Sequence, residues 1–80
     1  MASPSVFIAQ YYELTLRVRF QNGKWIVVVL GPYGLLITAN TEYDSQREAE
    51  RVAIGLAQTN LHEEKHDTRP VLEAVDWHSV

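Results

Sequence analysis

The segment from His62 to His66 comes closest to a catalytic motif in residue type and spacing. His62-Glu63-Glu64-Lys65-His66 matches the H-E-x-x-H pattern, in which two histidines on one helical face bind zinc and the glutamate acts as a base. The two middle residues are charged, however, and Pro70 predicts that the helix ends soon afterwards. A chain of 80 residues is also too short to build a substrate cleft around such a helix. We expect a solvated helix end, with adventitious metal binding as the alternative, and no metal or cofactor site.

Other catalytic patterns are missing from the sequence. The serines at positions 3, 5, 45 and 79 lie near the termini or at a predicted helix start, and none stands in a nucleophile-elbow pattern. Gly31-Pro32-Tyr33-Gly34 lacks the lysine of a phosphate-binding loop and joins two predicted strands. Trp77 and His78 are most simply a surface pair. We therefore expect a protein that is not an enzyme.

The charged residues divide the chain into halves of opposite sign. Residues 1–40 carry three basic residues, Arg17, Arg19 and Lys24, and one acid, for a net charge of +2. Residues 41–80 carry four basic and nine acidic residues, for a net charge of −5. Two ordinary solvated faces would explain this division. The alternative is a dipolar surface that orients a partner.

Alternating residues predict the strand that positions the basic group. From Tyr12 to Phe20 apolar and polar residues alternate, so Arg17 and Arg19 would share the outer face of a strand. The inner face would carry Tyr12, Leu14, Leu16, Val18 and Phe20. Asn22-Gly23 then predicts a tight hairpin turn. The uniformly apolar run Trp25–Leu30 predicts a central strand that is covered on both faces.

Two further segments complete the predicted sheet. Gly31-Pro32-Tyr33-Gly34 predicts a turn and Leu35–Ala39 a third strand. Val6–Ala9 either extends the first strand or covers the core as an arm. The sequence therefore predicts an α+β fold, an antiparallel sheet of three or four strands with one helix packed on one face.

The helix is predicted to run from about Gln46 to Leu61 or beyond. Ser45 and Glu48 have the spacing of a capping box at its start. The side that faces the sheet is predicted from helical spacing and consists of Ala49, Val52, Ala53, Leu56 and Asn60, with Ala57 at its edge. Ile54 and Leu61 would point to the opposite side, either as scattered surface residues or as a second stripe that contacts a partner.

Residues 1–80 are predicted to form a single domain with two distinct end segments. These are a flexible N-terminus at residues 1–5 and a C-terminal segment at residues 67–80, which forms a strand, a short helix that starts at Pro70, or an arm that contacts a partner. Since the chain has no cysteine, no disulfide supports its small core, and association would add stability. No signal peptide or membrane-spanning run is evident, which favours the cytoplasm.

A set of short motifs resembles known sheet-and-helix modules. The motifs are Gly23-Lys24-Trp25, Tyr43-Asp44-Ser45 and Glu48-Ala49. They resemble AP2-type and integrase arm-binding DNA domains over about residues 12–60. That resemblance implies a three-stranded sheet that enters the major groove with Arg and Trp side chains. The family tends to place Arg in the second strand, where this chain has Ile-Val-Val-Val. The same pattern is similar to the small YegP-like modules, whose function is unknown.

These observations favour a small non-enzymatic module that binds another protein. The apolar central strand, the second helix stripe and the apolar C-terminal segment would each need to be covered. The predicted contact residues are Arg17, Arg19, Lys24, Ile54, Leu61 and Trp77. A small acidic protein of this kind could be a phage or mobile-element inhibitor that resembles anti-CRISPR proteins. The alternatives are a homodimer and a sheet-face DNA-binding domain that uses the three basic residues.

Overall fold

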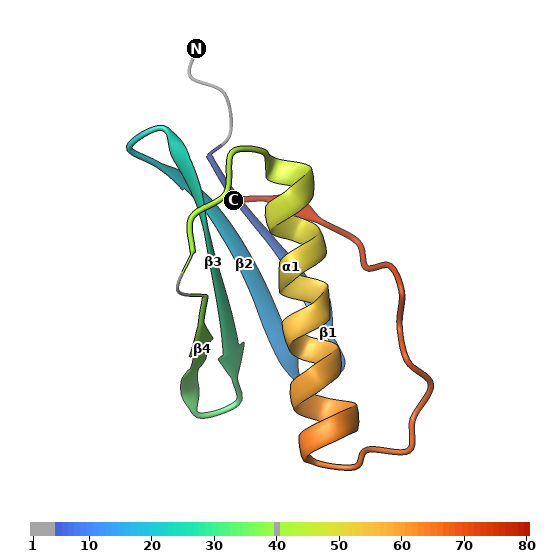
Figure 1. The fold of residues 1–80 in the computed structure, drawn as a ribbon. Coiled ribbons are helices and arrows are strands. Elements are labelled where there is room, and N and C mark those ends of the chain that lie inside the picture. The colour runs from blue at the N-terminus through green and yellow to red at the C-terminus, as the bar shows by residue number, and fades with distance from the viewer. Residues whose placement is uncertain (1–4, 40) are drawn as a thin grey trace.

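An antiparallel sheet carries one helix across one of its faces (Figure 1). The computed structural model describes residues 5–39 and 41–80, so the predicted flexible N-terminus lies outside the described residues except for Ser5. The strands are β1 (Val6–Tyr11), β2 (Leu14–Gln21), β3 (Lys24–Gly31), β4 (Gly34–Thr38) and β5 (His78–Ser79), in the spatial order β4-β3-β2-β1-β5. The helix α1 (Gln46–Gln58) continues into a π-helical segment, η1 (Thr59–Glu64). The predicted α+β class is confirmed, but the described residues form five strands where three or four are predicted.

The structure has more strands than predicted because the chain turns at Tyr12. The alternating pattern predicts a continuous strand there, whereas the structure has a hairpin turn between β1 and β2. Tyr12 adopts a φ of 55°, and β1 pairs antiparallel with β2 from Val6 to Tyr11. The prediction that Tyr12 belongs to the strand is therefore wrong, and Val6–Ala9 is part of a separate strand. Neither turn residue is Gly, Pro, Asn or Asp, so the sequence holds none of the usual turn chemistry at this point.

The next two turns form where the sequence predicts them. Asn22 and Gly23 have φ values of 53° and 81°, the pair of positive angles that a tight hairpin turn requires. Gly34, with a φ of 117°, begins β4 after the second turn. The apolar strand β3 lies inside the sheet, between β2 and β4. Its pairing with β4 shifts register between Val29 and Leu30, which marks a β-bulge.

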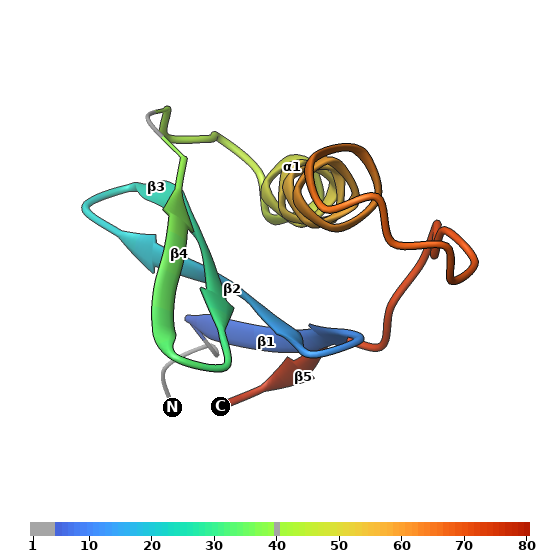
Figure 2. The same cartoon turned by 90° about the horizontal axis from the view of Figure 1, so that it is seen from below.

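The helix α1 begins at a side-chain cap and packs on the sheet through alanines. Ser45 Oγ accepts a hydrogen bond from the Glu48 amide at 3.1 Å, which is one half of the predicted capping box. Ala49, Ala53 and Ala57 are fully buried because they recur every fourth residue on the side that contacts β2 and β3. Figure 2 shows the helix lying over one face of the sheet.

The π-helical segment decides the position of Leu61. The Lys65 amide donates to the Asn60 carbonyl at 3.1 Å, the five-residue spacing of a π-helix. Since a π turn contains more residues than an α turn, each residue advances less around the axis and Leu61 rotates towards the sheet. Leu61 is 3% exposed and belongs to the core. The prediction that it lies on an outer stripe is therefore wrong, while Asn60 is buried on the core side as predicted.

The C-terminal segment, residues 67–80 and here called the strap, leaves the helix end and returns to β1 (Figure 1). Its last residues form β5, where His78 pairs with Ile8 and the Val80 amide donates to the Val6 carbonyl at 2.9 Å. Of the predicted alternatives for this segment, a strand does form, and it is two residues long. The rest of the strap lies beside the helix, outside the sheet.

Candidate functional site

The sheet face turned away from α1, here called the open face, carries the predicted basic group. Arg17 pairs with Ile8 on β1 and with Val28 on β3, and directly paired residues share a face of the sheet. The central residues of the open face are Val6, Ile8, Thr15, Arg17, Arg19, Ile26, Val28, Leu30 and Leu35. Among the described residues, no helix or strand crosses this face (Figure 2).

The three predicted basic residues differ in how strongly their charges are neutralised. Lys24 donates a hydrogen bond to the Asp44 carboxylate, and this contact raises the pKa of Lys24. Arg19 donates from Nη2 to Gln21 Oε1 at 2.7 Å, which leaves its charge unbalanced. In residues 5–39 and 41–80, no carboxylate lies within ion-pair distance of Arg17 or Arg19. The structure thus brings Arg17 and Arg19 together as free charges, whereas the charge of Lys24 is paired with Asp44.

Aliphatic side chains extend across the open face to the β3–β4 hairpin. Val28 is only 9% exposed, since its paired neighbours Arg17 and Thr38 flank it on either side. Further along, Leu30 pairs with Leu35, which is 67% exposed. Apolar area bordered by arginine is typical of protein-contact surfaces. The sequence did not single out these aliphatic residues, because an all-apolar strand does not reveal which residues face outward.

The predicted contact residues Ile54 and Trp77 lie on the helix side of the molecule. Both are half-buried, and together with Val75 they line one shallow hollow between α1 and the strap. The strap thus places its own apolar residues beside the second helix stripe. With Leu61 in the core, the six predicted contact residues do not form one surface: Arg17 and Arg19 lie on the open face, and Ile54 and Trp77 lie beyond the opposite face.

A hydrogen-bonded chain fixes the strap to β1 and to the helix end. The Leu72 amide donates to the Tyr11 hydroxyl oxygen at 2.9 Å, and that hydroxyl lies 2.8 Å from His62 Nε2. His62 Nδ1 lies 3.2 Å from the Asp67 carbonyl oxygen. Since a carbonyl can only accept, a neutral imidazole with its proton on Nδ1 satisfies every partner. The Tyr11 side chain at the centre of this chain is fully buried. We call the hydrogen-bonded residues Tyr11, His62, Asp67 and Leu72 the tyrosine latch.

Arg69 forms a second attachment between the strap and the β1–β2 turn. Its Nη2 donates to Glu13 Oε1 at 2.8 Å and to Asp67 Oδ2 at 2.6 Å. Its guanidinium carbon lies 4.1 Å from the centroid of the Tyr12 ring, within cation–π range. Hydrogen bonds from the Arg69 side chain and backbone lower the pKa of Asp67 to about 2. These contacts, with the Tyr12 hydroxyl donating to the Pro70 carbonyl at 2.6 Å, hold Tyr12 in its left-handed turn conformation.

The two histidines of the H-E-x-x-H pattern do not lie together on one helical face. Both ring nitrogens of His62 contact partners in the tyrosine latch, whereas His66 lies past η1 with a left-handed φ of 55°. In the part of the chain that the structure describes, no group of three His, Cys, Asp or Glu side chains could hold a metal ion.

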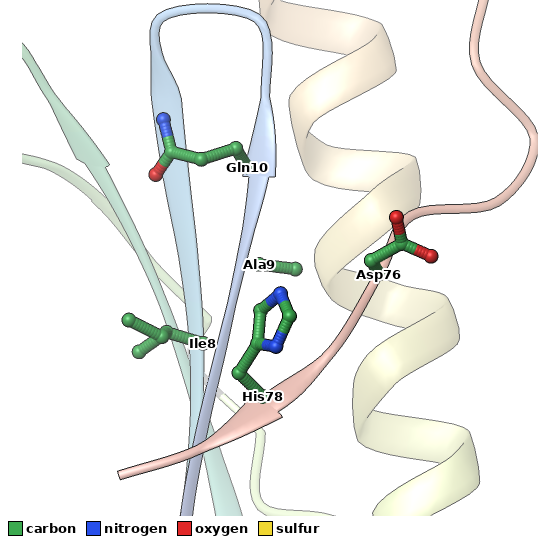
Figure 3. A pocket seen from close by; sticks show the side chains of 5 residues that line it. All are labelled: Ile8, Ala9, Gln10, Asp76 and His78. Atoms are coloured by element: carbon green, nitrogen blue, oxygen red, sulfur yellow. The ribbon is translucent and has the colours of Figure 1, made fainter.

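A further hollow lies where the strap diverges from β1 (Figure 3). Its volume is about 230 Å³, and Ile8, Ala9, Gln10, Asp76 and His78 line it. Because β5 pairs with β1 only up to Ile8, the peptide groups of Gln10 face this gap at the sheet edge. Figure 3 shows the Asp76 carboxylate turned away from the His78 ring, so the two groups do not form an acid–base pair.

Comparisons were made with protein-family models, curated proteins and solved structures, and none of them matches the chain. The resemblance to AP2-type, integrase arm-binding and YegP-like modules therefore stays a prediction. Among the described residues, no helix is both long enough and apolar enough to cross a membrane.

Proposed function

We propose that the chain is a non-enzymatic module that binds another protein through its open face. The observation that carries this proposal is the aliphatic area around Val28, bordered by the unpaired charges of Arg17 and Arg19, on a face that no described element crosses. Burying aliphatic surface supplies the affinity of a typical interface. The two arginines supply orientation and specificity.

The chemistry of the open face indicates the surface that it binds. Arg17 and Arg19 require carboxylates opposite them, since an arginine buried without a partner costs free energy. The aliphatic residues require apolar side chains between those carboxylates. The acidic half of the chain, residues 41–80, supplies the helix and the whole strap. The molecule therefore presents its basic side to the partner, and its charge separation would orient the encounter.

The inhibitor role fits this mode of binding, because a small module can block a partner by covering its working surface. In this proposal a phage or mobile element encodes the module, which acts in the cytoplasm by binding a protein complex. A second copy of the chain is the alternative partner, and light scattering separates the two: a monomer at micromolar concentration is expected.

A protein surface suits the open face better than a DNA duplex does. Sheet-face DNA readers use many phosphate contacts, and each contact adds to the affinity and to its salt dependence. Here Lys24 is paired with Asp44, so two arginines remain on the face. DNA binding through Arg17, Arg19 and Lys24 is therefore the weaker proposal.

Affinity capture with matched variants tests the proposed function. The open-face variant carries Arg17→Glu and Arg19→Glu, and its control carries Arg47→Glu and Arg51→Glu on the exposed side of α1, with the same change in charge. Cell extract from the natural host is passed over the wild-type, open-face and control proteins. We expect at least one protein to be retained by the wild type and by the control but lost from the open-face variant. Equal retention by all three, or by none, would contradict the proposal.

A further inference from the structure

We propose that a hollow behind the β3–β4 hairpin anchors an aliphatic side chain of the partner that stands next to a carboxylate. The hollow has a volume of about 160 Å³, and its walls include Gly31, Pro32, Tyr33, Leu36 and Lys65. Figure 1 shows the turn of this hairpin and the end of the helix at the same end of the molecule. The inference rests on the proposed function and deepens it, because it specifies the segment that the partner supplies.

Gly31 lines the hollow without placing a side chain in it. Val27 and Val29 are buried on the helix-facing side of β3, and position 31 continues this row by alternation. A Cβ atom placed on Gly31 would lie 3.8 Å from Leu36 Cδ2, which is ordinary van der Waals contact. The backbone there needs no positive φ. A side chain at this position would therefore fit, and the hollow is the space that it would fill.

The walls of the hollow are more apolar than polar, and the β-bulge supplies one of them. Leu36 is the extra residue between the pairs Val29–Ile37 and Leu30–Leu35, and it is 40% exposed. Tyr33 is fully exposed at the rim. An apolar cavity of about 150 Å³ can hold a benzene molecule, so this hollow has room for the side chain of a leucine or isoleucine. Filling it would cover Leu36, which is otherwise in contact with water.

Lys65 adds a positive charge at the rim. In residues 5–39 and 41–80 its ammonium group has no carboxylate within ion-pair distance, whereas Lys24 and Arg69 are both paired. Charge complementarity therefore favours a carboxylate beside the inserted aliphatic group. An acidic and apolar partner segment matches the chemistry that the open face requires, and Leu35 belongs both to the open face and to the lining of the hollow.

A peptide titration followed by NMR tests this inference. The probe is acetyl-Ala-Leu-Asp-Ala-amide, with acetyl-Ala-Leu-Asn-Ala-amide as the uncharged control peptide. We expect shifts of the backbone amides at residues 31–36 and at Lys65, with a dissociation constant on the order of 1 mM because the probe buries a single side chain. An exposed ion pair contributes a few-fold in affinity, so the control peptide and the Lys65→Gln variant should each bind about threefold more weakly.

The variant Gly31→Val supplies the decisive comparison, since valine should fill the hollow without disturbing the hairpin. Shifts that disappear in Gly31→Val, in a protein whose other resonances stay in place, would support the anchor site. No shift at residues 31–36 in the wild type, or unchanged shifts in Gly31→Val, would overturn it. The open-face variant of Arg17 and Arg19 should still bind the peptide. Failure of the proposed function would therefore appear as equal partner capture by the wild type and the open-face variant, or no capture by either, with the peptide response intact. Failure of the anchor site alone would appear as a lost peptide response with partner capture intact.

Discussion

The hydroxyl group of Tyr11 lies 2.8 Å from Nε2 of His62 and joins the first strand to the end of the helix, 51 residues later in the chain. The same oxygen accepts the Leu72 amide at 2.9 Å, so one buried side chain connects β1, η1 and the strap. Gln58 reinforces the attachment through its Nε2, which donates to the Leu72 carbonyl at 2.8 Å. The strap therefore keeps its place beside the helix through hydrogen bonds to Tyr11 and Gln58 as well as through apolar packing.

Replacing Tyr11 by Phe tests the tyrosine latch. The variant keeps the ring but removes the hydrogen bonds to the Leu72 amide and to His62 Nε2, and each of these part-buried bonds contributes about 0.5–1.5 kcal/mol. Urea denaturation should show a loss of free energy of unfolding of that size, and hydrogen exchange at the Leu72 amide should accelerate. Tyr33→Phe is the matched control, since Tyr33 is fully exposed. Equal stability of the Tyr11→Phe and Tyr33→Phe variants would contradict the role of the latch.

The contact between Asp67 and Arg69 predicts an acid-sensitive strap. Hydrogen bonds from Arg69 hold the pKa of Asp67 at about 2, below its ordinary value of 3.8. A lowered folded-state pKa stabilises the fold above the ordinary value, and this contribution is lost as the pH falls from about 4 to 2. Thermal unfolding followed by circular dichroism should show a smaller decline in Tm over this range for Asp67→Asn than for the wild type. Parallel declines in the two proteins would show that Asp67 has no such role.

Part of the fold follows from local patterns that the sequence displays plainly. Leu14, Leu16 and Val18 are buried, as period-two alternation predicts. Asn22-Gly23 forms its turn and Ser45 caps its helix, because both depend on interactions within a few residues. The α+β class follows once these elements are in place.

The features that the sequence did not reveal depend either on contacts between distant residues or on local geometry that a regular pattern does not contain. The turn at Tyr12 has no turn residue, and it is held by Arg69 and Pro70 from the other end of the chain. The position of Leu61 depends on a local change from α- to π-helical geometry, which a uniform helical period cannot include. The open face was predicted through Arg17, Arg19 and Lys24 and through the need to cover the apolar strand, but its individual apolar residues were not, since the apolar residues of β3 carry no alternation.

The burial of Leu61 gives a direct test of the corrected helix geometry. Truncating a buried leucine to alanine costs about 2–5 kcal/mol, so Leu61→Ala should strongly lower the free energy of unfolding in urea. Leu35→Ala is the control, and because Leu35 is 67% exposed its effect should stay within about 0.5 kcal/mol. A mild Leu61→Ala variant that loses partner binding would instead support an exposed stripe.

A gel-shift experiment separates protein binding from DNA binding. With two free arginines on the open face, the chain should give no shifted band with a short duplex at physiological salt, up to tens of micromolar protein. Lowering the salt concentration serves as the positive check, since weak non-specific binding would then appear. A band at physiological salt that Arg17→Ala with Arg19→Ala abolishes would favour the DNA-binding alternative.

The central claim is that the open face binds a protein, and calorimetry on the captured partner tests it most directly. Reversing the charges of Arg17 and Arg19 places like charges opposite the carboxylates of the partner, which costs affinity. We predict that the dissociation constant rises about tenfold or more, equivalent to about 1.4 kcal/mol, while the Arg47→Glu and Arg51→Glu control binds as the wild type does. Equal dissociation constants for the open-face variant and the wild type would contradict the account.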